Sequence, residues 1–318
     1  MSRIAVTIGD PAGIGPEICL KALAGTRLAD AGGAVLVGGR AVLERCAGTL
    51  GIAMVADDRI VDVPVEGVAD IEPGKVSEVA GRASVAYVEA ACRLANAGEV
   101  DAIVTAPVNK EALRAAGCPH IGHTELLAAL FGVSDPLTMF VTGTLRVFFL
   151  TRHLSLRDAI DEVKQPNVLA SLEAVDAAMR GLGFARPSIA LAALNPHAGD
   201  GGQFGDEEAV ELAPAVEDAR RRGIDAHGPI PADSVFHQAL GGACDCVLSL
   251  YHDQGHIATK TRDFYGTVTA TLGLPVLRTS VDHGTAFDIA WQGVASEESL
   301  VKALRLAEEL LAVPRASG

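Results

Sequence analysis

The chain has 318 residues, a formal net charge of −14 and a hydrophobic share of 49%. This length suits one large domain or two ordinary ones, and the acidic balance argues against nucleic acid or an anionic membrane surface as a partner. A small anionic substrate is compatible with it, because such a ligand needs only a few local Arg or Lys side chains or a helix N-terminus.

Aromatic residues make up only 4% of the chain, so the core has to be built from small and branched aliphatic side chains, as in α/β proteins. Six cysteines are scattered without a C-x-x-C pair, which favours reduced thiols over a disulfide framework. We see no signal-peptide pattern and no run of about eighteen apolar residues. We therefore expect a cytoplasmic protein without a membrane span.

Short apolar runs alternate with amphipathic stretches along most of the chain. The expected buried strands are Arg3–Ile8, Ala34–Val37, Asp101–Thr105, Ser188–Ala193 and Cys246–Leu250. The expected helices are Ser77–Ala97, Asn109–Ala116, Thr124–Phe131, Pro166–Leu182, Asp206–Arg222 and Ser296–Leu311. This alternation predicts βαβ units and a largely parallel sheet.

One segment departs from the alternation. Leu137–Val141 and Leu145–Thr151 flank the pair Gly143-Thr144, which is typical of an antiparallel hairpin. Such a hairpin marks a change of subdomain.

The first expected strand ends in the loop GDPAGIGPE, Gly9 to Glu17. Its spacing does not match G-x-G-x-x-G, and no Lys-Ser/Thr closes it as in a Walker A loop. A tight strand-to-helix turn is the favoured interpretation, and a phosphate-binding loop is the alternative.

Three expected strands each end in a segment that contains histidine. TRHLS carries His153, LNPHAG carries His197, and YHDQGH carries His252 and His256. Because carboxyl ends of parallel strands meet at one edge, three neutral imidazoles there would make a catalytic divalent-metal site with open positions. We expect His252 rather than His256 as the ligand, because Gly255 and the loop-like context argue against a helical histidine pair.

Further polar residues follow other expected strands. Thr124 in GHTE either caps a helix or, with His123, binds a phosphate. Arg278 is a candidate for bidentate binding of a carboxylate or phosphate, with a surface ion pair as the alternative. Asp233 and Lys260 are ionisable residues that could carry protons.

Taken together, the motifs resemble the 4-hydroxythreonine-4-phosphate dehydrogenase family, whose enzymes use NAD(P) and a divalent metal in pyridoxine phosphate biosynthesis. The resemblance runs almost end to end through GDPAGIGPE, TAPVNK, GHTE, LNPHAG, GPIPAD, YHDQG, LGLP and RTSVDHGTA. It implies an α/β fold of the isocitrate/isopropylmalate dehydrogenase type, not a Rossmann fold, with two α/β domains flanking a central cleft. We expect residues 1–122 and 266–318 to form the first domain, on the cofactor side. Residues 123–265 should form the second domain, which carries the metal ligands and the dimer contacts.

The resemblance also implies roles for individual residues. Its metal ligands match His153, His197 and His252, the three residues at strand ends. Its substrate-binding positions match His123, Thr124, Lys260, Thr269 and Arg278. The acids Asp233 and Asp253, together with Lys260, are the candidate proton-transfer groups. The nucleotide-side loop matches His283, Gly284, Thr285, Ala286 and Asp288.

The implied activity is oxidation of the secondary alcohol of a phosphorylated hydroxy acid to a β-keto acid that loses CO2, in a homodimer with the active site at the subunit interface. The first candidate substrate is 4-phosphohydroxy-L-threonine. The resemblance does not decide whether the cofactor is NAD or NADP, or whether the metal is Zn, Mg or Co.

Two departures from the biosynthetic pattern widen the choice of substrate. Thr269 stands where the biosynthetic enzyme has an asparagine, and His256-Ile257 replaces an apolar residue and proline. The alternatives are threonate or erythronate 4-phosphate and a cis-dihydrodiol carboxylate, and His123-Thr124 favours a phosphorylated substrate among them. A non-catalytic metabolite-binding paralogue is the alternative from another class, whereas the missing Walker lysine argues against a phosphoryl transferase.

Overall fold

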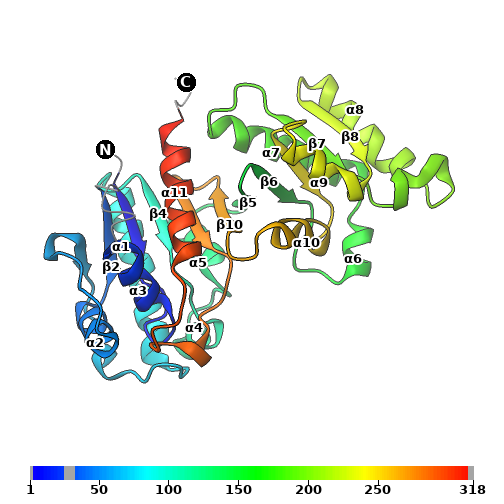
Figure 1. Ribbon diagram of the computed structural model, residues 1–318. Coiled ribbons are helices and arrows are strands. Elements are labelled where there is room, and N and C mark those ends of the chain that lie inside the picture. Colours follow the sequence, from blue (N-terminus) through cyan, green and yellow to red (C-terminus); the bar gives the residue numbers. More distant parts are fainter. Residues whose placement is uncertain (1–2, 25–32, 314–318) are drawn as a thin grey trace. The chain divides into compact units, whose positions relative to one another are not determined.

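The computed structural model describes residues 3–24 and 33–313 and divides into two compact units (Figure 1). The first unit contains Met1–Pro136 and Val268–Ala312, and the second contains Leu137–Thr267. The helix that begins at His123 therefore belongs to the first unit.

In the first unit the strand order is β3-β2-β1-β4-β11-β10. All neighbours are parallel except β10 and β11. The strands are β1 (Ile4–Thr7), β2 (Ala34–Gly38), β3 (Ile60–Asp62), β4 (Ala102–Thr105), β10 (Val268–Leu272) and β11 (Leu277–Val281). The helices are α1 (Gly15–Ala24), α2 (Arg40–Leu50), α3 (Glu78–Asn96), α4 (Lys110–Ala115), α5 (His123–Phe131) and α11 (Glu298–Ala312).

Helices pack on both faces of this part of the sheet. On one face, Ala5 and Ile103 join a buried cluster with Val88 of α3 and Leu127 of α5. On the other face, the Thr279 hydroxyl donates a hydrogen bond to the Ala303 carbonyl of α11, at 2.8 Å. Because side chains alternate along a strand, the neighbouring Arg278 points to the α3 and α5 face.

In the second unit the strand order is β5-β6-β9-β7-β8, with β5 and β6 antiparallel and the others parallel. The strands are β5 (Leu137–Thr142), β6 (Leu145–Phe149), β7 (Ser188–Ala192), β8 (Asp225–Ile230) and β9 (Cys246–Ser249). The helices are α6 (Leu156–Asp161), α7 (Gln165–Gly181), α8 (Ala213–Arg221), α9 (Ala232–Leu240) and α10 (His252–Arg262). The expected hairpin is confirmed as β5 and β6, with Phe140 opposite Val147.

The GDPAGIGPE segment is confirmed as a tight turn between β1 and α1. A side chain at Gly15 would place its Cβ 2.0 Å from the Ile8 carbonyl oxygen, and Gly9 has φ +69°. The two glycines are thus required by close backbone approach and by a left-handed backbone angle. Among the described residues, no helix is long and apolar enough to cross a membrane.

Candidate active site

The three candidate metal-ligand histidines, all in the second unit, lie at one edge of its sheet. His153 follows β6, His197 follows β7, and His252 begins α10 directly after β9. These three strands are parallel neighbours in the order β6-β9-β7, with Phe149 opposite Ser249 and Leu191 opposite Leu248. Their carboxyl ends therefore share an edge, as the strand-end argument predicts.

His252 is held by Asp253 and His256. Its Nδ1 lies 2.7 Å from Asp253 Oδ1, and its ring stacks on that of His256 with centroids 3.8 Å apart and planes 8° from parallel. His256 Nδ1 in turn donates to the His252 carbonyl at 2.9 Å. With Nδ1 engaged by a carboxylate, Nε2 is the ring nitrogen available to a ligand, the usual arrangement at metal-binding histidines.

The expectation that His252 and His256 do not share a helix is wrong. Both lie on α10, one turn apart. Gly255 is required here by packing, because a Cβ would come within 2.5 Å of the Phe149 ring and 2.7 Å of Ser249 Oγ. The glycine that argued for a loop instead lets the helix lie close against β6 and β9.

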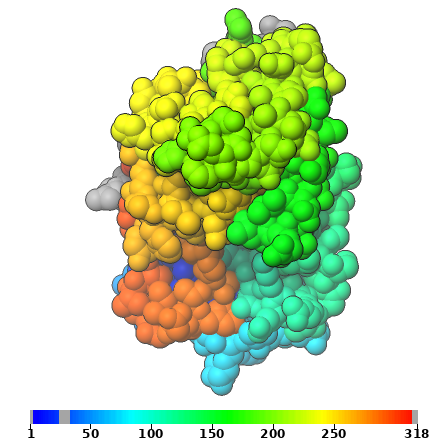
Figure 2. Space-filling view, turned by 90° about the vertical axis from the view of Figure 1, so that its right-hand side faces the viewer, coloured from blue at the N-terminus to red at the C-terminus, as the bar shows by residue number. Residues whose placement is uncertain are grey.

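The described residues bring His153 and His252 together but do not complete a metal site in one chain. The two ring centroids are 6.4 Å apart. Within residues 3–24 and 33–313, no group of three or more His, Cys, Asp or Glu side chains is arranged to hold a metal ion. His197 is exposed on the segment around residue 200, which lies at the surface in Figure 2 (yellow-green). Imidazoles suit a divalent ion as donors, and the described residues do not gather all three of them into one group.

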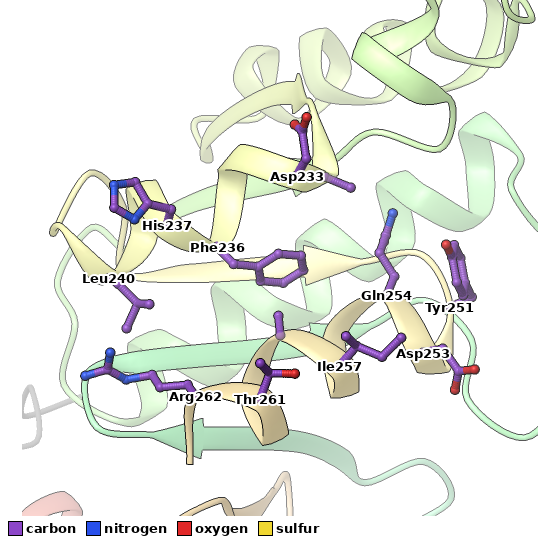
Figure 3. Close-up of a pocket in the computed structure, with 12 residues that line it drawn as sticks. Asp233, Phe236, His237, Leu240, Tyr251, Asp253, Gln254, Ile257, Thr261 and Arg262 are labelled. Carbon is purple, nitrogen blue, oxygen red and sulfur yellow. The ribbon is translucent and has the colours of Figure 1, made fainter. Parts of the chain in front are cut away.

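A pocket of about 730 Å³ lies between α9 and α10 of the second unit. Asp233 from α9 and Asp253 from α10 both line it, with Phe236 and Ile257 between them (Figure 3). Two of the candidate proton-transfer residues therefore share one pocket. Lys260, the third, lies on α10 with its Nζ 5.1 Å from the Phe264 ring centroid.

Gln254, at the wall of this pocket, was missed by sequence reasoning. Its Nε2 donates to the Ala193 carbonyl at 2.7 Å, and its Oε1 accepts the Leu250 amide at 2.8 Å. It therefore connects the ends of β7 and β9 to the first turn of α10. Its place in the motif YHDQG was the sequence feature that could have pointed to it.

In the first unit, Arg278 is a buried cation held by hydroxyl groups. It is 4% exposed, and its guanidinium donates to Thr105 Oγ1 at 2.6 Å and to Thr271 Oγ1 at 3.0 Å. Burial lowers its pKa to about 10, and the negative charge of Glu125 offsets part of that shift. The alternative of a surface ion pair is wrong, because the side chain is buried and its hydrogen bonds go to neutral hydroxyls.

His123 lies at the first position of α5, close enough to Arg278 for the guanidinium to influence its titration. Burial, and secondly Arg278, lower the pKa of His123 well below its usual range. The imidazole is therefore neutral at pH 7, and its buried Nε2 has no hydrogen-bond partner among the described residues.

Thr124 is not the cap of α5. The cap position is Gly122, which has no side chain to accept the first amides, and His123 and Thr124 are both within the helix. An uncapped helix N-terminus leaves amide donors and a partial positive charge, which favour an anion. Thr269, the remaining candidate of this unit, is 6% exposed, and its hydroxyl lies 3.4 Å from the Ser280 carbonyl.

The candidate cofactor loop packs against the first loop of the chain. The Ile14 amide donates to the Thr285 carbonyl at 3.0 Å, and a Cβ at Gly13 would meet Thr285 Cβ at 2.9 Å. His283 Nδ1 bonds the Gly284 carbonyl at 3.0 Å, and Ala286 has φ 42°. Asp288 is the exposed middle residue of the short 3₁₀ turn Phe287–Ile289.

Comparison with known proteins gives matches along nearly the whole chain. A family model described as pyridoxal phosphate biosynthetic protein PdxA matches residues 31–307. A Halalkalibacterium halodurans protein named "Putative D-threonate 4-phosphate dehydrogenase" is 48% identical, covering 96% of this chain and 95% of its own.

Two solved structures extend these matches. A 4-hydroxythreonine-4-phosphate dehydrogenase from Klebsiella pneumoniae has a TM-score of 0.90 at 42% identity, covering 97% of this chain and 98% of its own. A terephthalate 1,2-cis-dihydrodiol dehydrogenase from Burkholderia xenovorans LB400 has a TM-score of 0.68 at 33% identity, covering 97% and 98%.

These matches place the chain among the α/β dehydrogenases that act on a CH–OH group, and they confirm the expected fold class. The chain belongs to the PdxA family. The family resemblance read from the motifs is thereby confirmed.

Proposed function

We propose that the chain is a metal- and NAD(P)-dependent dehydrogenase that oxidises the secondary alcohol of a 4-phosphorylated four-carbon hydroxy acid. The observation that carries this proposal is the buried guanidinium of Arg278, held by Thr105 and Thr271 near His123 at the start of α5. A buried cation whose neighbours are hydroxyls keeps its charge available for an anionic ligand.

The phosphate would be bound by three kinds of donor in the first unit. Arg278 offers charged N–H groups in fork geometry, α5 offers the amides of its uncapped first turn, and neutral His123 offers a ring N–H. Thr124 contributes one of those amides and its hydroxyl. Together they favour a phosphorylated substrate over an unphosphorylated dihydrodiol.

The hydroxyl to be oxidised would be bound at the second unit's histidines. We propose that His153, His197 and His252 hold one divalent ion, which would polarise that hydroxyl and lower its pKa. The family resemblance implies a homodimer with the active site at the subunit interface. A donor set shared between two copies accounts for the lack of a three-donor group among the described residues of one chain.

The residues around the pocket of the second unit would move the proton. Asp253 already orients His252, and Asp233 lines the same pocket, so either carboxylate can accept a proton from the substrate, as can the neutral amine form of Lys260. Hydride would pass to NAD or NADP at the loop of His283 to Asp288. The resulting β-keto acid then loses CO2.

Among phosphorylated acids, we favour D-threonate 4-phosphate. The curated relatives that carry this name are 46–48% identical to the chain, whereas the solved 4-hydroxythreonine-4-phosphate dehydrogenases are 40–42% identical. Oxidation at C3 and loss of CO2 would leave a phosphorylated three-carbon hydroxyketone. 4-Phosphohydroxy-L-threonine, the first candidate from sequence, is the second choice.

Replacing Arg278 tests the phosphate assignment. Arg278→Met keeps a long apolar side chain in the buried site but removes the charge, so we expect kcat/KM for D-threonate 4-phosphate to fall about 10- to 100-fold. The kcat/KM for unphosphorylated D-threonate should change little, so that the preference for the phosphorylated acid falls by the same factor. Arg305→Met, at an exposed arginine of α11, is the matched control and should behave as wild type. Equal loss on both acids would show that Arg278 does not bind the phosphate.

A further inference from the structure

The loop that carries His197 has an unusual backbone. Residues 197–201 all have positive φ: 53° at His197, 56° at Ala198, 79° at Gly199, 43° at Asp200 and 68° at Gly201. This is a left-handed turn, and three of its five members have a side chain that disfavours that conformation. Something outside the turn must therefore hold it.

The buried carboxylate of Glu208 hydrogen-bonds to the residues that lead into this loop. It is 6% exposed, and its Oε1 accepts the backbone amides of Leu194 at 2.9 Å and Asn195 at 2.7 Å. Its Oε2 accepts the side-chain amide of Asn195 at 2.9 Å. Two of the three donors are therefore main-chain groups immediately before Pro196-His197.

The turn and the carboxylate also touch at Gly199. A Cβ there would lie 3.0 Å from Glu208 Oε2, so a side chain at this position would press against the carboxylate. Glu208 itself is the first residue of a π-helical segment, Glu208–Leu212, that leads into α8. Single π turns inside helices occur often at functional sites, where they aim a side chain that a regular helix would direct elsewhere.

A carboxylate matches this set of partners because both of its oxygens are acceptors. Three N–H groups converge on its two oxygens, and a carboxylate is purely an acceptor. A glutamine would turn an NH2 group toward at least one of the same donors and lose that bond. The chemistry of the position thus specifies Glu rather than a neutral residue of equal size.

We propose that Glu208 is a positioning residue: it holds the left-handed turn after β7 and thereby fixes where the His197 imidazole is presented to the metal ion. This inference rests on the proposed role of His197 as a ligand. Outer groups that orient a ligand are worth about 10- to 100-fold in metal affinity.

The test is Zn²⁺ affinity of the full chain, measured by competition with a chromophoric chelator, with the Co²⁺ visible absorption spectrum as a second readout. Glu208→Gln should weaken Zn²⁺ binding by about 10- to 100-fold and alter the Co²⁺ bands. Glu211→Gln is the matched control, because Glu211 lies in the same π segment and accepts the Gln165 amide at 2.7 Å, away from the loop. Its Zn²⁺ affinity should equal that of wild type even where its melting temperature falls.

A double-mutant comparison separates this inference from the proposed function. His197→Ala should itself weaken Zn²⁺ binding, and Glu208→Gln added to it should cause no further loss. Unchanged affinity in Glu208→Gln, with a loss in His197→Ala, would overturn the role of Glu208 alone. No loss in His197→Ala would instead refute the ligand assignment and this inference with it.

A second variant covers the case in which Glu208→Gln does not fold. Gly199→Ala perturbs the same contact from the side of the loop, with a Cβ 3.0 Å from Glu208 Oε2 at φ +79°. It should also weaken Zn²⁺ binding, and wild-type affinity in this variant would contradict the proposal.

Discussion

The ionisable side chains of Arg278 and Asp10 are both buried in the first unit. Arg278 keeps its proton at neutral pH even though burial lowers its pKa to about 10, and the hydroxyls around it bind it without cancelling its charge. Asp10, by contrast, is a buried acid. It is fully buried after β1, its Oδ2 has no hydrogen-bond partner among the described residues, and burial raises its pKa to about 6. The amides of Ala12 and Asn109 offset only part of that shift.

The raised pKa of Asp10 predicts a pH-dependent cost to stability. Because the folded-state pKa lies above the unfolded value of 3.8, the native state holds the proton more tightly, and ionisation costs stability as pH rises from about 4 through about 6. A shift of this size corresponds to roughly 3 kcal/mol at most.

Asp10→Asn tests this cost by urea unfolding at a series of pH values. The free energy of unfolding of the variant, relative to wild type, should rise by up to about 3 kcal/mol between pH 4 and pH 7. Asp58→Asn, at an exposed carboxylate, is the control for the change in net charge. A difference between Asp10→Asn and wild type that stays constant with pH would contradict the account.

At the scale of helices and strands, glycines decide how closely the elements pack. Gly255 lets α10 lie against β6 and β9, and Gly81 does the same for α3 against α4. A Cβ at Gly81 would lie 2.0 Å from the Ala112 carbonyl oxygen and 2.9 Å from Ala116 Cβ. Because backbone cannot move aside as a side-chain end does, the two helices would have to separate.

Gly81→Ala should therefore destabilise the protein, by about 1–3 kcal/mol in thermal or urea unfolding. Gly48→Ala is the matched control: Gly48 lies exposed on α2 with nothing within 4 Å of the added Cβ. Alanine there should stabilise the helix by about 0.5–1 kcal/mol. The same sign of effect for the two substitutions would show that backbone contact at Gly81 is not the cause.

These elements also show how far the sequence predicts the structure. The alternating apolar runs predict β1, β2, β4, β7 and β9 and the hairpin of β5 with β6. The strands β10 and β11 were missed, because Thr269, Thr271, Arg278 and Ser280 make them look polar although every residue in them is buried.

The positions of candidate site residues were predictable where a strand end fixes them. The strand ends of β6, β9 and β7 place His153, His252 and His197 at one edge by topology alone. The left-handed turn at His197 was not predictable, because it depends on Glu208 from the following segment rather than on the loop's own composition. The hydroxyls of Thr105 and Thr271 around Arg278 depend on strand pairing in the same way.

At the scale of the whole molecule, the two units carry different parts of the proposed chemistry. The first holds the proposed anion-binding side chains and the candidate cofactor loop, and the second holds the three candidate ligand histidines and the acids around the pocket. The chain belongs to the PdxA family, and the family model matches residues 31–307, which include most of both units.

The most direct test is the rate of nicotinamide reduction by the purified wild-type chain, with CO2 release measured in parallel. The substrates are D-threonate 4-phosphate, 4-phosphohydroxy-L-threonine and a cis-dihydrodiol carboxylate, each with NAD or NADP and with and without a chelator. We predict the highest kcat/KM with D-threonate 4-phosphate, one CO2 for each reduced nicotinamide, loss of activity with the chelator and recovery with a divalent metal. Turnover that is unaffected by the chelator, or that is fastest with the unphosphorylated dihydrodiol, would contradict the account.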